Sequence, residues 1–200
     1  WNSAFNAEPG IYSKEQIHGW QRVTSAVHKG GGQIFLQIWH GGRACHPDMN
    51  NGHETVAPSA IAIDGEVQTL KGKVRHVVPR ALDDREIPTY VGYFKQAAIN
   101  AREAGFDGVE VHGANGYLID QFLRDSANRR TGPYGGSLAN RSRFLLEVLR
   151  EVTGVWGADR VGLRLSPLNS YNSMKDSDPV ALIQHLAREL SPLRLAYLHL

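Results

Sequence analysis

The stretch Gly105-Phe-Asp-Gly-Val-Glu-Val-His-Gly-Ala-Asn-Gly-Tyr117 guides the interpretation of the whole chain. Its pattern is that of a buried strand that ends in polar residues and turns directly into a helix. Because side chains alternate along a strand, one face of it carries Gly108, Glu110 and His112. A polar face is costly to bury unless a site uses it, and α/β folds build active sites where strands end. The stretch therefore predicts a functional site at the end of this strand.

The composition is that of an ordinary globular protein and excludes several classes. The chain has 200 residues, 42% of them hydrophobic, and a formal net charge of +2, which gives no electrostatic footprint for nucleic acid. Cys45 is the only cysteine, so the chain can form no internal disulfide and no cysteine-based zinc or iron–sulfur site. His40, His46 and His53 lack the spacing of metal ligands, and we expect no metal.

The ends of the chain carry no sign of export or membrane insertion. No apolar run approaches the roughly 18 residues of a membrane span, and the first residues do not resemble a signal peptide. We expect a cytoplasmic protein, a monomer or homodimer, without a membrane or nucleic-acid partner. The chain starts at Trp1 and ends on the apolar run 195–200, so we also expect a segment of something longer.

Helices and strands are predicted to alternate along most of the chain. Ser13 and Gln16 form a capping box that opens the first helix. Further helices are expected at 88–104, 118–124, 138–155 and 178–190. In addition to the strand in the opening stretch, strands are expected at 33–39, 160–166 and 196–200. Residues 44–85 break the pattern and predict an excursion with some β-hairpin character, lying as a lid over one end of the fold.

This alternation predicts a parallel sheet, either in a TIM-type (β/α)8 barrel or in an open doubly wound sheet. Polar residues on the inward faces of three successive strands favour the barrel, because they converge on one axis. We therefore expect residues 1–200 to be part of a single barrel domain.

Arg164 is the most informative single residue, because a lone arginine inside an apolar strand needs a partner. An ion pair with Glu110 and contact with an anionic ligand are equally reasonable. Gln37 and Trp39 could be core residues, and His112 could be structural. However, all of these residues lie at the exit end of a strand, which favours a site. Motifs for a Rossmann site, a P-loop or a serine hydrolase are absent from the sequence.

Four motifs in order resemble the old yellow enzyme family, which consists of FMN-dependent NADPH dehydrogenases and ene-reductases on an eight-stranded β/α barrel. The resemblance runs from about Pro9 to Leu200 and implies that the chain covers about strands three to six. Within the family, the chain looks closest to trypanosomatid members described as prostaglandin F2α synthases. The motifs are Phe35-Leu-Gln-Ile-Trp-His-Gly-Gly-Arg43, Val109-Glu-Val-His-Gly-Ala-Asn-Gly-Tyr117, Tyr134-Gly-Gly-Ser137 with Asn140-Arg141, and Val161-Gly-Leu-Arg-Leu-Ser-Pro167.

The resemblance also implies roles for single residues. Gln37 would bind the pyrimidine edge of FMN, and Arg164 would lie near its N1 and C2 carbonyl. Tyr117 would be the catalytic proton donor. The substrate would be bound by His112, Asn115 and Trp39. One departure is Gly132, where many relatives carry Asp, and the phosphate site of FMN should lie outside this segment.

The implied reaction is a ping-pong hydride transfer in which NADPH reduces FMN and the flavin then reduces the activated C=C bond of an α,β-unsaturated carbonyl compound. The same flavin site could instead serve a prostaglandin endoperoxide, a quinone or a nitro compound as the small-molecule substrate. A flavin-free barrel lyase is the alternative from a different class. It would need a Schiff-base lysine or metal ligands at the strand ends, and the four predicted strands offer neither.

Overall fold

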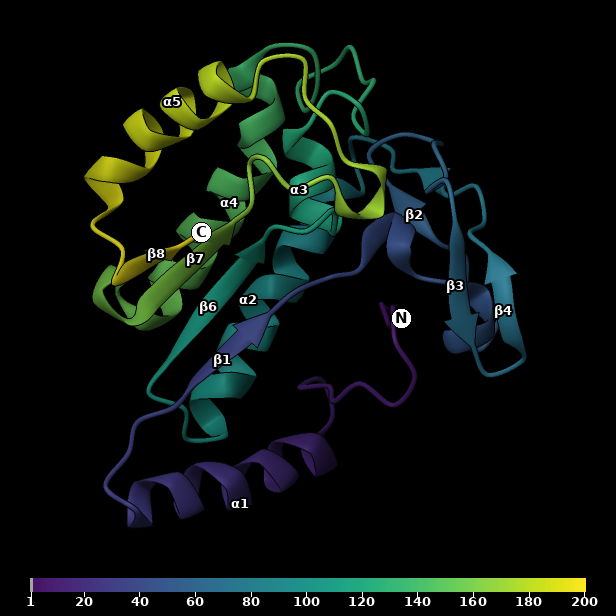
Figure 1. Ribbon diagram of the computed structural model, residues 1–200. Coiled ribbons are helices and arrows are strands. Elements are labelled where there is room, and N and C mark those ends of the chain that lie inside the picture. The colour runs from purple at the N-terminus through teal and green to yellow at the C-terminus, as the bar shows by residue number, and fades with distance from the viewer. Residues whose placement is uncertain (1) are drawn as a thin grey trace.

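The computed structural model describes residues 2–200 and is built on a four-stranded sheet in the order β1-β6-β7-β8, in which every pair is parallel (Figure 1). The predicted parallel sheet is confirmed, and each strand lies within its predicted stretch. Consecutive parallel strands joined by helices are the repeating unit of a β/α barrel. The strands are β1 (Phe35–Ile38), β6 (Gly108–Gly113), β7 (Val161–Leu165) and β8 (Tyr197–His199).

Five α-helices occupy the predicted ranges with small shifts at their ends. The side chain of Ser13 accepts a hydrogen bond from the backbone N–H of Gln16, which confirms the capping box. Asp178 caps the last helix in the same way. No helix among residues 2–200 has both the length and the apolar character needed to cross a membrane. The helices are α1 (Lys14–Lys29), α2 (Ile87–Glu103), α3 (Leu118–Leu123), α4 (Leu138–Trp156) and α5 (Pro179–Leu190).

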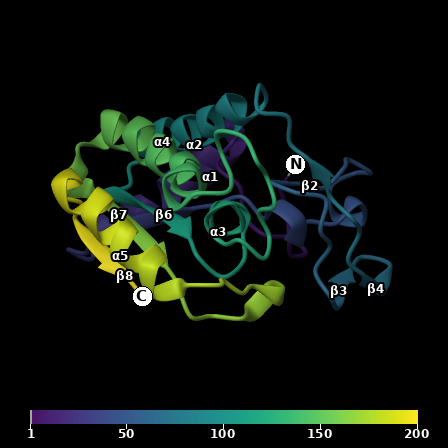
Figure 2. The same cartoon turned by 90° about the horizontal axis from the view of Figure 1, so that it is seen from above.

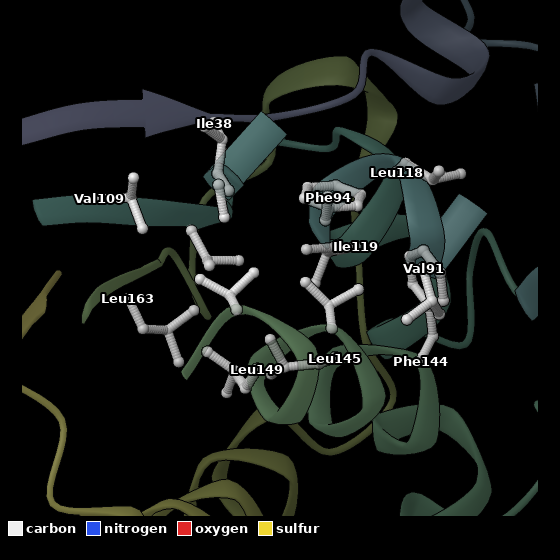
Figure 3. Close-up of a cluster of buried hydrophobic side chains, with 14 of the residues drawn as sticks. Ile38, Val91, Phe94, Val109, Leu118, Ile119, Phe144, Leu145, Leu149 and Leu163 are labelled. Atoms are coloured by element: carbon white, nitrogen blue, oxygen red, sulfur yellow. The ribbon is translucent and has the colours of Figure 1, made fainter. Parts of the chain in front are cut away.

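The hydrophobic core lies between one face of the sheet and helices α2, α3 and α4 (Figures 2 and 3). Val109 and Leu163 leave neighbouring strands toward these helices, and both are fully buried. Phe94 of α2 and Phe144 of α4 meet edge to face, with ring centroids 6.3 Å apart. Full burial of one such side chain stabilises the fold by about 1.5–3 kcal/mol. The core thus holds one face of the sheet against helices and leaves the opposite face to the polar residues.

The predicted excursion, residues 44–85, contains two small sheets beyond the carboxyl end of β1 (Figure 1). The predicted hairpin character is confirmed by β3 (Glu66–Thr69) and β4 (Gly72–Arg75), which pair in antiparallel fashion. β2 (Val56–Ala57) and β5 (Arg80–Ala81) form a short parallel pair at its base. The excursion therefore stands next to the strand ends where the site is expected.

Candidate active site

The register of the sheet brings the predicted cofactor and substrate residues into adjacent rows. Gln37 of β1 lies opposite Glu110 of β6, and His112 of β6 lies opposite Arg164 of β7. Neighbouring strands are about 4.8 Å apart, so paired residues on one face are within side-chain reach. The predicted convergence of Gln37, His112 and Arg164 on one face at the strand ends is thus what the register produces.

Three predicted residues form an aromatic cluster at this end of the sheet. Trp39 follows β1 directly, and its ring centroid lies 4.4 Å from that of Tyr117. The His112 ring is 5.2 Å from Tyr117 and 6.1 Å from Trp39. Tyr117 occupies the N-cap position of α3 and is only 7% exposed. The end of β1, strand β6 and the start of α3 therefore bring an indole, an imidazole and a phenol together.

His112 is held as a neutral hydrogen-bond donor. Its Nδ1 accepts the backbone N–H of Ala114 at 3.2 Å, so the remaining proton of the neutral ring sits on Nε2. Burial, followed by the positive charge of Arg164, lowers the pKa of His112 to about 4. At neutral pH the imidazole is therefore uncharged and can offer one N–H through Nε2.

Tyr117 keeps its phenolic proton over an unusually wide pH range. Burial is the main cause that raises the pKa of Tyr117 to about 12, and the nearby Tyr171 and Glu8 act in the same direction. A reference tyrosine has a pKa of about 10. The side chain is therefore available as a proton source well above neutral pH.

Asn115 has a left-handed backbone, with φ at 55°, and is held there from three directions. Its backbone N–H donates to Ser166 Oγ at 2.7 Å. Its backbone carbonyl accepts from Asn172 Nδ2 at 2.9 Å, and its side-chain Oδ1 accepts from Asn169 Nδ2 at 2.9 Å. Sequence reasoning missed these asparagines, although their position just after a strand exit was the signal that identified the others.

Glu110 does not pair with Arg164, so the structural alternative for that arginine is wrong. Glu110 instead accepts hydrogen bonds from Gln37 Nε2 at 2.5 Å and from His199 Nδ1 at 3.1 Å. Burial raises the pKa of Glu110, but the bonds from Gln37, His199 and Tyr197 outweigh it and hold the pKa below its ordinary value. Within residues 2–200, the guanidinium of Arg164 makes no hydrogen bond or ion pair.

Side chains of β8 can reach Glu110 because the residue of β7 that lies between β6 and β8 at this point is Gly162. A Cβ at Gly162 would lie 2.2 Å from the ring of Tyr197, so only glycine lets β8 side chains reach over β7 toward Glu110. Tyr197 uses this opening, and His199 of the same strand also reaches Glu110. Side chains of β1 and β8 therefore supply the hydrogen bonds of the Glu110 carboxylate. The guanidinium of Arg164 needs a different acceptor.

A cleft of about 310 Å³ adjoins the aromatic cluster. Tyr117, Tyr171 and Asn172 line one side of it, and residues 64–68 of the excursion line the other. The excursion therefore forms a wall of the cleft next to the predicted proton donor, which is compatible with the predicted lid.

The departure at Gly132 has a local explanation. A Cβ at Gly132 would lie 3.0 Å from Oδ2 of Asp84, and Asp84 forms an ion pair with Arg130. An aspartate at position 132 would bring a second carboxylate against Asp84. Gly132 leaves room for the carboxylate of Asp84, which belongs to the excursion.

The comparison with known families covers nearly the whole chain. Residues 2–200 match the model of the NADH:flavin oxidoreductase / NADH oxidase family. A probable flavin mononucleotide-dependent alkene reductase from Leishmania infantum is 52% identical over 98% of this chain and 55% of its own length. A putative 12-oxophytodienoate reductase-like protein from Arabidopsis thaliana is 46% identical over 98% of this chain and 60% of its own length. The chain thus spans little more than half the length of these relatives.

Solved structures agree with the sequence relatives. The old yellow enzyme from Trypanosoma cruzi superposes with a TM-score of 0.95 at 42% identity, covering 98% of this chain and 57% of that one. A morphinone reductase mutant in complex with tetrahydroNAD gives a TM-score of 0.92 at 45% identity, covering 96% of this chain and 54% of that one. The TIM-type barrel class is confirmed, with this chain as a part of it. The chain belongs to the NADH:flavin oxidoreductase / NADH oxidase family, and its predicted resemblance to the old yellow enzymes is confirmed.

Proposed function

We propose that this chain provides the catalytic half of an FMN-dependent oxidoreductase that uses NADPH to reduce the activated C=C bond of α,β-unsaturated carbonyl compounds. The observation that carries the proposal is the cluster in residues 112–117. There a neutral histidine donor, a left-handed asparagine and a buried protonated tyrosine lie within six residues of chain. The names of the relatives, among them an alkene reductase and a morphinone reductase, support this reaction class.

The residues present fit a flavin. Arg164 offers its guanidinium on the same face as Gln37, and it needs an acceptor that residues 2–200 do not supply. Gln37 uses Nε2 to bind Glu110, so its Oε1 remains as an acceptor. A guanidinium and an amide oxygen match the mixed acceptors and donors along the pyrimidine edge of FMN. When bound, FMN would supply the hydride transfer from NADPH to the alkene.

The role of His112 and Asn115 is to hold the substrate carbonyl oxygen. The Nε2–H of His112 and the amide Nδ2 of Asn115 are both neutral donors. Negative charge grows on the carbonyl oxygen as the β-carbon is reduced, so these bonds strengthen as the reaction proceeds. Loss of one such donor typically costs about 2.7–4 kcal/mol of barrier.

Tyr117 completes the reaction by giving its phenolic proton to the α-carbon. Tyr117 lies at the start of α3, where it packs against Trp39 and His112 and lines the cleft. Residues 64–68 of the excursion line the same cleft. Trp39, whose ring packs against that of Tyr117, would contact the substrate beside it.

The test uses the complete enzyme, meaning the protein that carries this chain within a closed eight-stranded barrel. FMN should bind without a covalent link and give a yellow protein. Consumption of NADPH should depend on an added cyclic enone, and the isolated product should carry a saturated C=C bond. The flavin-free lyase predicts a colourless protein that cleaves its substrate without NADPH, and this result would rule out the proposal.

A further inference from the structure

The loop between β7 and α5 contains a side chain, Asn169, that the proposed reaction does not yet use. Its Oδ1 accepts the backbone N–H of Tyr171 at 2.7 Å. A backbone N–H can only donate, so the Asn169 amide has one permitted orientation, with Oδ1 toward Tyr171. Its Nδ2 is thereby turned toward the side chain of Asn115.

This contact decides which end of the Asn115 amide is available. Asn169 Nδ2 donates to Asn115 Oδ1 at 2.9 Å, so the acceptor end of Asn115 is occupied. The backbone of Asn115 is fixed on both sides by Ser166 and Asn172, which leaves a half-turn of the amide as its main freedom. That half-turn would place the Nδ2 of Asn115 against the Nδ2 of Asn169, donor against donor. Among residues 2–200, no group accepts from Asn115 Nδ2 in the observed orientation.

The loop that carries Asn169 is itself anchored by buried arginines. Nη2 of Arg124 donates to the carbonyl of Asn169 at 3.0 Å, and Arg124 is only 2% exposed. Nη2 of Arg43 donates to the carbonyl of Asn172 at 2.9 Å, and Arg43 is only 1% exposed. Asn169 is exposed, yet its backbone is tied to the interior on both sides of Tyr171.

We propose that Asn169 is a positioning residue that locks the amide of Asn115 with its N–H groups toward the substrate. The lock makes the pocket select ligands that present an acceptor, such as a carbonyl or phenolate oxygen, over ligands that present a donor. It acts through Asn115 and does not touch the substrate. The inference rests on the proposed function, because it assumes that Asn115 binds the substrate oxygen.

The test compares Asn169→Ala with Asn169→Asp in the complete FMN-loaded enzyme. The alanine removes the lock and should weaken binding of a para-substituted phenol by about 2- to 10-fold, the range of one neutral hydrogen bond. The aspartate still accepts the N–H of Tyr171, so the loop keeps its turn. It faces Asn115 with an oxygen, however, which reverses the amide and points Oδ1 at the ligand. Asn169→Asp should therefore bind the phenol more weakly than Asn169→Ala.

A merely structural role predicts the opposite order, because aspartate preserves the loop better than alanine does. Binding is measured by isothermal titration calorimetry with the phenol, at a pH at which it is ionised so that its oxygen only accepts, and with the matching aniline, whose N–H groups donate. In Asn169→Asp, the ratio of phenol affinity to aniline affinity should fall. A ratio equal to that of the parent protein, or stronger phenol binding in Asn169→Asp than in Asn169→Ala, would overturn the inference.

Two controls separate the lock from the added charge and from the proposed function. Ser170→Asp places the same charge on the adjacent exposed residue and should leave the affinity ratio unchanged. In an Asn115→Ala background, Asn169→Asp should have little further effect, because the residue through which it acts is gone. An equal effect in that background contradicts the lock. If Asn115→Ala alone leaves phenol binding intact, the proposed function fails instead.

Discussion

At the scale of single residues, burial shifts the pKa values of His112 and Tyr117 in opposite directions, yet both shifts keep the side chain uncharged. It lowers the pKa of His112 to about 4 and raises the pKa of Tyr117 to about 12. Both shifts favour the uncharged form, because a buried environment penalises charge of either sign. Between these values both side chains are neutral donors, which is the state required at an oxygen that gains negative charge.

Tyr117→Phe tests the proton donor. The flavin should still be reduced by NADPH at nearly the parent rate, because that half-reaction needs no proton from Tyr117. Alkene reduction should slow by about 100- to 10,000-fold, the range of general acid catalysis. Stopped-flow absorbance resolves the two half-reactions, and equal slowing of both would contradict the assignment.

His112→Gln tests the depressed histidine pKa through stability. The folded-state pKa of about 4 lies below the ordinary histidine pKa of 6.5, so the unfolded state takes up a proton first as the pH falls. The free energy of unfolding of the complete enzyme should therefore decrease from about pH 7 to about pH 5. Glutamine does not titrate, so His112→Gln should decrease less over this interval. Urea unfolding at both pH values measures the difference, and identical decreases would show that His112 is not neutral in the folded protein.

At the scale of elements, the short helix α3 depends on a buried ion pair. Asp120 accepts the backbone N–H of Gly116 at 2.8 Å and pairs with Nε of Arg124 at 3.1 Å. Burial raises the pKa of Asp120 to about 6, although Arg124 opposes this shift. The same arginine donates to the carbonyls of Ser166 and Asn169. One pair thus fixes both the turn that carries Asn115 and the loop that orients it.

Arg124→Met should therefore destabilise the complete enzyme by about 3–5 kcal/mol, because it leaves Asp120 buried without its partner. The matched control is Lys95→Met, which breaks the partly exposed pair with Glu151. That change should cost no more than about 1 kcal/mol. Urea unfolding of both variants gives the comparison, and similar losses in the two would show that the buried pair has no special role.

Element positions were largely predictable from sequence because their signals are local. The capping box at Ser13, the cap at Asp178 and the alternation along β6 depend on residues within a few positions of each other. The same alternation placed Gln37, His112 and Arg164 on one face. The partner of Glu110 was not predictable, because His199 of β8 reaches Glu110 of β6 across the intervening strand β7. The contact between Asn169 and Asn115 likewise depends on how a distant loop closes.

At the scale of the whole molecule, the four strands form an open sheet, in which β1 and β8 each have a neighbour on one side only among residues 2–200. All three residues of β8 are exposed, and the exposed fraction of Leu198 is 54%. Leu200, which follows β8, is 78% exposed. An edge strand with exposed apolar side chains favours aggregation, and a barrel avoids this by closing. The solved relatives, of which this chain covers little more than half, are barrels of this class.

Residues 1–200 expressed alone should therefore be insoluble or molten and should not retain FMN. Near-ultraviolet circular dichroism, size-exclusion chromatography and flavin absorbance give the three readouts, with the complete enzyme as the control. A monomer that unfolds cooperatively and binds FMN in a one-to-one ratio would show that the four strands need no further partners.

An anaerobic double-mixing experiment on the complete enzyme tests directly whether NADPH and the flavin reduce an enone at this site. NADPH is expected to bleach the flavin absorbance, and a cyclic enone added afterwards is expected to restore it with formation of one equivalent of saturated ketone. The His112→Ala and Asn115→Ala variants should bleach normally and recover slowly, because both donors act on the substrate oxygen. Recovery at the parent rate in both variants, or no bleaching by NADPH in the parent enzyme, would contradict the account.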